Sequence, residues 1–190
     1  GEMPNGWQRE VRLVEQRAEQ TQHNSRLNTR QRIVQAALEL FNQQGERQVT
    51  TNHIAAHLGI SPGNLYYHFR NKQTIVLELF GQYEQLVDQF LQRPQDRVMT
   101  VADKAFLLEA LLTVLWDYRF LHRDLQHVLA ADTELAQRYQ RLAQRCLNNA
   151  QGIYQGFADA GILRIDAASI EALVLNSWVL LTAWVPFVST

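Results

Sequence analysis

The sequence predicts an all-α protein in which a three-helix helix-turn-helix domain precedes a larger helical domain. Apolar residues recur at helical spacing along most of the 190-residue chain, and proline, which breaks helices, occurs only four times. Three short helical segments with brief turns between them also follow one another within residues 28–75. We therefore expect a polar extension over residues 1–27, the helix-turn-helix domain over 28–75 and the second domain over 76–190.

The helices of the smaller domain are predicted from their start and stop signals. The first helix begins at Asn28 and ends at Gly45, and the second begins after the N-cap Thr50 and ends at Gly59. The third begins after only three residues, with Ser61 as its cap and a proline at the first helical position. The apolar residues expected to form their common core are Ile33, Leu38, Phe41, Ile54, Leu58, Ile60, Leu65 and Phe69.

The rest of the chain reads as further helices. One helix over 71–92 stops before Pro94, and another is expected over 101–123. Asp132 caps a long helix that ends near a glycine at position 161, and Asp166 caps the last one. The larger domain is therefore expected to be a bundle of helices.

The distribution of charge separates the two domains, although the net charge is only -1. Residues 26–75 hold six Arg or Lys residues against two acids, and residues 76–190 hold nine against thirteen. A basic N-terminal module on an acidic body is typical of a nucleic-acid reader, and ordinary scatter of surface charge is the alternative.

Cysteine usage bounds the chemistry of the chain. Cys146 is the single cysteine, which excludes an intramolecular disulfide and a Cys-based zinc site. The N-terminal residues contain no apolar run typical of a secretory signal. Both observations predict a cytoplasmic location.

The third predicted helix carries the candidate binding residues. In a helix-turn-helix the second helix enters the major groove of DNA, with its N-terminal residues nearest the bases. An asparagine there can donate to and accept from a base edge, while tyrosine and histidine tips can bond phosphate. Lys72, in the next helix, would add a phosphate contact. The alternative is a purely structural motif, and at least one tyrosine is expected to be partly structural. The outward-facing set is Pro62, Gly63, Asn64, Tyr66, Tyr67 and His68.

The segment TRQRIVQAALELFNQQG and, after three residues, VTTNHIAAHLGISPGNLYYHFRNKQTIVLELF resemble the DNA-binding module of the TetR/AcrR family of bacterial transcriptional regulators over about residues 29–80. The resemblance implies a homodimer, a palindromic operator and an inducer pocket in the C-terminal domain, with repression as the usual mode and no catalytic activity. The family's DNA contacts carry over to Thr51, Pro62, Gly63, Asn64, Tyr66, Tyr67, His68 and Lys72.

Two features suggest other functions. His53 and His57 have the spacing of a zinc-protease helix, but Ile54 stands where the catalytic glutamate would be, and no third ligand is evident. We therefore expect no metal or other cofactor. Residues 172–188 are apolar enough to suggest a membrane span, but four polar or proline positions interrupt them, which favours a buried or dimer-forming helix. By the resemblance, the last two helices form a four-helix bundle with their dimer mates.

The sequence predicts a repressor that a small, largely apolar inducer releases from DNA. We expect that inducer beside Leu79, Tyr83, Leu86 or Phe90 of the helix over 71–92, where it would shift the recognition helix; no further ligand residues are predicted. A helical enzyme and a helical protein–protein adaptor are the alternatives. The Glu-x-x-His pairs of helical di-iron enzymes do not occur in the sequence.

Overall fold

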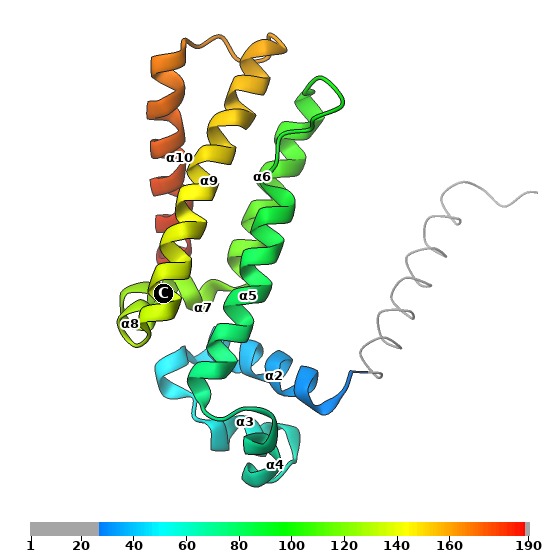
Figure 1. Cartoon of the computed structure of the whole chain (residues 1–190), viewed down its shortest axis with the longest axis vertical. Coiled ribbons are helices and arrows are strands. Elements are labelled where there is room, and N and C mark those ends of the chain that lie inside the picture. Colours follow the sequence, from blue (N-terminus) through cyan, green and yellow to red (C-terminus); the bar gives the residue numbers. More distant parts are fainter. Residues whose placement is uncertain (1–26, 189–190) are drawn as a thin grey trace, which may run out of the picture.

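The structure, a computed structural model that describes residues 27–188, consists of helices joined by short turns (Figure 1). Within that range it contains no strand, which confirms the predicted fold class. The predicted extension lies outside the described residues except for Leu27. The elements are α2 (Thr29–Gln44), the 3-10 turn η1 (Glu46–Gln48), α3 (Thr51–Leu58), α4 (Pro62–His68), α5 (Lys72–Phe90), α6 (Val101–Asp117), α7 (Arg119–Arg123), α8 (Leu125–Ala130), α9 (Thr133–Asp159) and α10 (Ala167–Val188).

Helices α2, α3 and α4 form a small domain at one end of the molecule (Figure 1). Each begins at an N-cap whose side chain accepts a backbone hydrogen bond: Asn28 for α2, Thr50 for α3 and Ser61 for α4. Their apolar faces meet in the predicted core. Ile33, Phe41, Ile54, Leu65 and Phe69 are buried there, and Leu38, Leu58 and Ile60 pack against them half-buried.

Helix α5 joins the small domain to the larger one, which we call the body. Its N-cap Asn71 accepts from the Thr74 N–H, and the helix then runs from the small domain along the body (Figure 1). It contacts α2 at one end and α6 and α9 further along. Because one continuous helix belongs to both domains, a shift of α5 against the body also moves the small domain.

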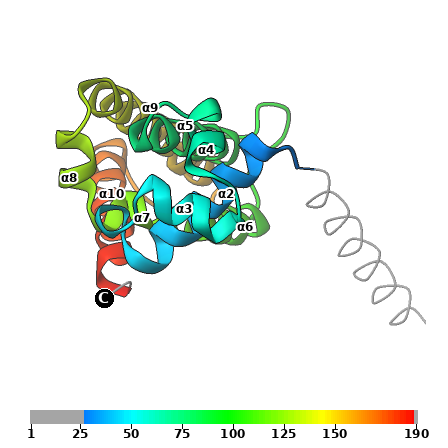
Figure 2. The ribbon, with the colours of Figure 1, turned by 90° about the horizontal axis from the view of Figure 1, so that it is seen from below.

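The body consists of α5, α6, α9 and α10 running beside one another, with α7 and α8 at the end that faces the small domain (Figure 1). Seen from below, α2, α3 and α4 lie in front of these helices (Figure 2). Asp132 caps α9 by accepting from Glu134 and Leu135, and Asp166 accepts from the Ser169 N–H at the start of α10. The two predicted caps of the body are thus confirmed.

The prediction of one helix over 101–123 is wrong, because the chain breaks at Tyr118. This residue leaves helical geometry (φ -114°, ψ 31°), and its buried side chain donates a hydrogen bond to Gln82 of α5. The groups freed by the break are taken up by Asn42 of α2, which donates to the Asp117 carbonyl at 2.7 Å and accepts from the Phe120 N–H at 3.1 Å. The partner that stabilises the break therefore lies in the other domain.

Candidate nucleic-acid interface and body cavity

The turn between α3 and α4 fixes how α4 is presented. Gly59 ends α3 in the left-handed conformation (φ 68°), and the Ile60 N–H donates to the Ala55 carbonyl across the turn. The Ser61 hydroxyl then accepts from the Asn64 N–H at 3.1 Å, which starts α4. Leu65 is completely buried and anchors α4 to the core. The opposite face of α4 is consequently directed to solvent.

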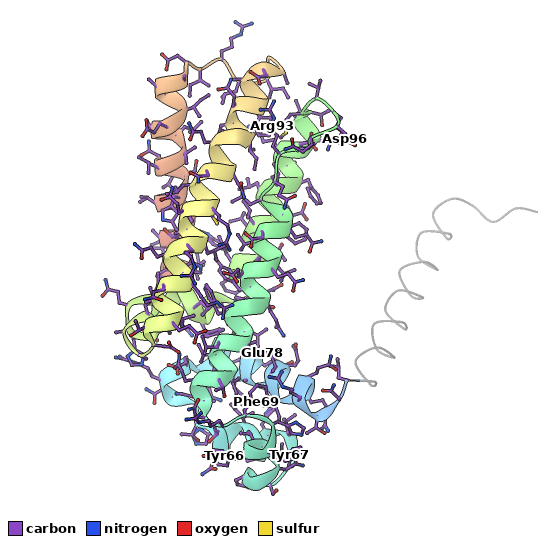
Figure 3. All side chains as sticks on the ribbon, viewed as in Figure 1. Tyr66, Tyr67, Phe69, Glu78, Arg93 and Asp96 are labelled. Carbon is purple, nitrogen blue, oxygen red and sulfur yellow. The ribbon has the colours of Figure 1, made fainter. Side chains whose placement is uncertain are left out.

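The predicted contact residues lie on that solvent-facing side. Tyr67 is 85% exposed and Tyr66 is 50% exposed. Both lie at the end of the molecule that the small domain forms (Figure 3). Their aromatic rings are large apolar groups left in water on an otherwise polar helix. The other predicted residues on α4 are the exposed Pro62, Gly63 and Asn64 and the half-buried His68.

The two tyrosines differ in their surroundings. The Tyr66 hydroxyl lies 3.1 Å from the Thr51 hydroxyl, so it links α4 to the first residue of α3. Tyr67 makes an edge-on contact with the ring of His68, with centroids 5.1 Å apart. Tyr66 is therefore partly structural, as expected for one of the two, and the tip of Tyr67 is the more available for a partner.

The ammonium of Lys72, predicted to contact a phosphate, is bonded to groups of the protein itself. Its ammonium donates to the Glu46 carbonyl at 2.9 Å and the Val49 carbonyl at 3.1 Å, and it lies 3.0 Å from the Glu46 carboxylate. Glu46 is buried. Lys72 therefore joins the start of α5 to η1, and a phosphate contact by Lys72 remains a prediction.

Some basic side chains of the small domain are bonded to other side chains, and others are not. Arg30 forms a two-point ion pair with Glu78, at 2.8 and 3.1 Å, and Arg47 bonds His127 of α8 at 2.9 Å. Within residues 27–188, the exposed Arg32 and Arg70 form no ion pair. Arg70 lies two residues after the end of α4, and its exposed guanidinium makes it a candidate phosphate contact that is absent from the set predicted from sequence.

The two histidines with zinc-protease spacing, His53 and His57, belong to α3. Both are exposed on α3, and His53 accepts from the Thr50 N–H in the capping box of that helix. No group of three or more His, Cys, Asp or Glu side chains suited to a metal ion occurs in the part of the chain that the structure describes.

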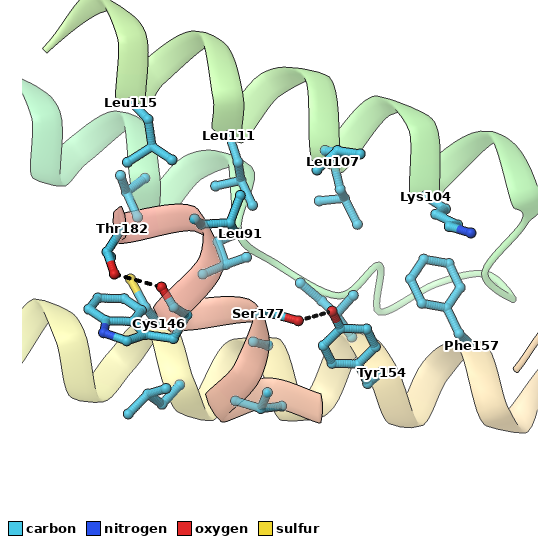
Figure 4. Close-up of a pocket in the computed structure, with 18 of the residues that line it drawn as sticks. Leu91, Lys104, Leu107, Leu111, Leu115, Cys146, Tyr154, Phe157, Ser177 and Thr182 are labelled. Carbon is cyan, nitrogen blue, oxygen red and sulfur yellow. Dashed lines mark hydrogen bonds between the residues drawn. The ribbon is translucent and has the colours of Figure 1, made fainter. Parts of the chain in front are cut away.

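The body encloses a cavity of about 320 Å³ between α5, α6, α9 and α10 (Figure 4). This volume lies within the usual range for small-molecule sites, about 300–1,000 Å³. Of the four α5 residues expected beside a ligand, only Tyr83 lines it; Leu79, Leu86 and Phe90 do not. The cavity-facing side of this segment is the row Tyr83, Val87 and Leu91, spaced four residues apart, whereas the ring of Phe90 packs against that of Phe106 with centroids 6.2 Å apart. Leu107, Leu111, Leu115, Ile153, Phe157 and Trp178 form much of the remaining wall.

Few polar groups face the cavity. The Tyr154 hydroxyl lies 2.6 Å from that of Ser177, and Thr182 donates to the Trp178 carbonyl at 2.7 Å. Burial raises the pKa of the Cys146 thiol to about 12, so this thiol stays neutral and behaves as an apolar wall group. The interior is suited to apolar molecules.

A short chain of contacts leads from the cavity to the small domain. The Tyr83 hydroxyl, on the cavity wall, lies 2.8 Å from Nε2 of His122 in α7. Burial lowers the pKa of His122 to about 4, which keeps this imidazole neutral. Phe120 of the same helix donates to Asn42 of α2. Helix α7 therefore contacts both the cavity wall and the small domain.

Comparison with known families agrees with this two-domain organisation. Residues 33–79 match the family model described as "Bacterial regulatory proteins, tetR family", and residues 82–190 match the model described as "Bacterial transcriptional repressor". The chain belongs to the TetR family. This membership favours the DNA-binding regulator over the adaptor, and it confirms the resemblance read from the segment around α2 to α5.

Individual relatives are of the same kind. A TetR-family transcriptional regulator from Marinobacter aquaeolei VT8 has a crystal structure that is 49% identical, with a TM-score of 0.82 over 85% of this chain and 80% of that one. The fatty acid metabolism regulator protein of Bacillus subtilis is 31% identical over 60% of this chain and 55% of its own length. QacR of Staphylococcus aureus is 32% identical over 45% of each. The matches to these curated relatives thus span about half of their length.

The sequence predicted the exposed outer face of α4 in this TetR-family chain, but not which residues line the cavity of the body. The cavity wall is drawn from four helices and a loop, whose apolar residues have the same spacing as ordinary core residues. The hydrogen bonds of Asn42 to Asp117 and Phe120 could not be predicted from the sequence either, because these partners lie 75 and 78 residues further along the chain.

Proposed function

We propose that this TetR-family protein is a transcriptional repressor that binds a palindromic operator and leaves it when a small, largely apolar molecule binds the body. The observation that carries the DNA-binding part is the outer face of α4. It presents an exposed asparagine and an 85% exposed tyrosine on a helix whose other side is anchored by a fully buried leucine. Such a rigidly held polar face suits the major groove.

The residues on this face have distinct proposed roles. Asn64 reads a base edge, because its amide can donate and accept at once. Tyr67 packs its ring on sugar or a thymine methyl and bonds phosphate through its hydroxyl, and Pro62 and Gly63 allow the backbone to come close to the DNA. Thr51, Tyr66, His68 and Lys72 complete the predicted contact set, and we add the exposed Arg70 to it.

A single short helix offers too few base contacts for selectivity, so two copies are needed. Helix α10 supplies a surface for this pairing, because one of its faces is apolar and exposed at helical spacing. Val179 is 61% exposed and Leu180 71% exposed at the middle of this face. We define the α10 stripe as Ala172, Leu175, Asn176, Val179, Leu180, Ala183 and Phe187.

Pairing through the α10 stripe also explains the apolar character of α10 without a membrane. The helix is long and apolar enough to cross a bilayer, but it packs along one side against α9 and α7 within the body. A stripe of this kind is expected when a second copy covers it. A cytoplasmic homodimer follows as part of the proposal.

Binding of a molecule in the cavity is the proposed cause of release from the operator. A molecule seated there touches Tyr83 on α5, the helix that also belongs to the small domain, and Tyr83 is bonded to His122 on α7. Ligand binding can change operator affinity only by preferring one arrangement of these helices. A coupling of about 1–3 kcal/mol would be typical, and operator DNA would weaken ligand binding by the same factor.

The DNA-binding part is tested by selecting duplexes from a random pool with the purified protein. The proposal expects enrichment of an inverted repeat whose half-sites are about one helical turn, or a multiple of it, apart. Its affinity should fall steeply with salt. A pool without sequence enrichment, or a shift equal for all duplexes at every salt concentration, would favour the adaptor.

A further inference from the structure

The cavity is a channel rather than a round chamber. Its α6 wall runs from Lys104 to Leu115 and its α9 wall from Cys146 to Phe157, each an interval of eleven residues. At 1.5 Å per residue, both walls are about 16 Å long. A volume of about 320 Å³ spread over this length leaves a narrow passage. An elongated molecule fits it better than a compact one.

One end of this channel carries a positive charge. Lys104 is the only Lys, Arg, Asp or Glu among the lining residues, and it begins the row that continues with Leu107, Leu111 and Leu115 along α6 (Figure 4). It is exposed, so this end opens to solvent. Its neighbour Asp103 is already held by Arg97 at 2.6 Å. Within residues 27–188, no carboxylate forms an ion pair with Lys104.

Three of the hydroxyls that line the channel, those of Tyr154, Ser177 and Thr182, already donate their protons within the protein. Ser177 donates to the Leu173 carbonyl at 2.8 Å, so Tyr154 is the donor in its contact with Ser177. Thr182 donates to the Trp178 carbonyl. These hydroxyls therefore have no proton left for an acceptor on a ligand. A polar acceptor placed along this part of the channel would lose its bonds to water, whereas an apolar body would not.

We infer that the channel takes an elongated amphipathic anion, such as a long-chain carboxylate, with its apolar body along α6 and α9 and its carboxylate at Lys104. The unpaired ammonium at the open end and the apolar walls behind it carry this inference. It rests on the proposed function only for the consequence of binding, namely release from DNA; the ligand class itself is a property of the cavity.

The inference is tested by calorimetric titration of the whole chain with dodecanoate, dodecanol and dodecylammonium, the two ions below their micelle concentrations and the alcohol below its solubility limit. We expect dodecanoate to bind more tightly than the alcohol, and the alcohol more tightly than the amine. Lys104→Met keeps the aliphatic stem and removes the charge, so it should weaken dodecanoate about fivefold and leave dodecanol unchanged. Lys104→Glu should reverse the order of the two ions. Arg32→Met removes an exposed cation of the small domain and should change nothing.

Each result decides between separate claims. Equal binding of carboxylate and alcohol, unaffected by Lys104→Met, would overturn the anionic ligand while leaving an apolar inducer in place. Binding with the expected order but no effect of dodecanoate on operator affinity would support the ligand class and contradict release. If none of the three compounds binds, the inferred ligand class is overturned, whereas DNA binding by the protein is judged separately by the duplex selection. Unchanged thermal unfolding of the Lys104 variants shows that a lost preference is not a folding defect.

Discussion

At the scale of single residues, two side chains join parts of the molecule that the sequence keeps apart. His122 holds a neutral imidazole inside the body, bonded to Tyr83 at 2.8 Å. Its Nδ1 has no hydrogen-bond partner in the described residues. The Lys72 ammonium donates to the carbonyl oxygens of Glu46 and Val49 and forms an ion pair with the Glu46 carboxylate, all in the segment before α3. Both arrangements have measurable consequences for stability.

The burial of His122 makes stability depend on pH. Its pKa is lowered from 6.5 to about 4 in the folded chain, so between these values the unfolded chain binds the extra proton. The free energy of unfolding therefore falls as the pH drops through this window, by about 2 kcal/mol between pH 7 and pH 5 for this group. Denaturant unfolding at several pH values should show that His122→Gln, whose amide can still bond Tyr83, flattens this loss. If the free energy of unfolding of the parent and of His122→Gln changed with pH in the same way, the assignment of this loss to His122 would be refuted.

Lys72 is expected to contribute to folding as well as to DNA binding. Lys72→Met leaves the buried Glu46 carboxylate without its ammonium partner, which should lower the free energy of unfolding by about 1–3 kcal/mol. Adding Glu46→Gln removes the unpaired charge and should recover part of the loss. Denaturant titration of the three proteins measures this. If the single variant is as stable as the parent, the contacts of Lys72 are not structural, and its ammonium is free for phosphate.

At the scale of elements, the helices that carry local signals could be predicted and those fixed by distant contacts could not. Thr50, Ser61 and Asp132 cap their helices as expected, because a capping side chain acts within three residues of itself. The break at Tyr118 depends on Asn42, far away in the sequence. The outer face of α4 followed from helical spacing alone. The cavity did not, since an apolar residue beside a void looks like any core residue in the sequence.

Filling the channel should separate ligand binding from DNA binding. Ala150 lies on the α9 wall, so Ala150→Phe places a ring inside the cavity. Apolar ligands should then bind at least about tenfold more weakly, while operator affinity without ligand is retained. Ala105→Phe, on the exposed face of α6, is the matched control and should respond like the parent. Calorimetry and operator anisotropy give the two readouts. A full ligand response in Ala150→Phe would place the ligand elsewhere.

At the scale of the whole molecule, the proposed pairing through the α10 stripe determines how two recognition helices reach one operator. Val179→Asp puts a charge in the middle of this face, and burying it in a dimer should weaken pairing by at least about 2 kcal/mol. Sedimentation velocity at micromolar concentration should show a dimer for the parent and a monomer for the variant. Val101→Asp, at an exposed valine of α6, should remain dimeric. A dimeric Val179→Asp protein would move the interface away from the stripe.

The central claim is that α4 reads DNA sequence, and the affinity of Asn64→Ala for the selected operator tests it most directly. Fluorescence anisotropy should show a loss of about 1–3 kcal/mol for that operator and almost none for unrelated duplex, because only the base contact is removed. Gln89→Ala, which removes an exposed amide from the body part of α5, should bind like the parent. Equal operator affinity for Asn64→Ala, Gln89→Ala and the parent would contradict the claim.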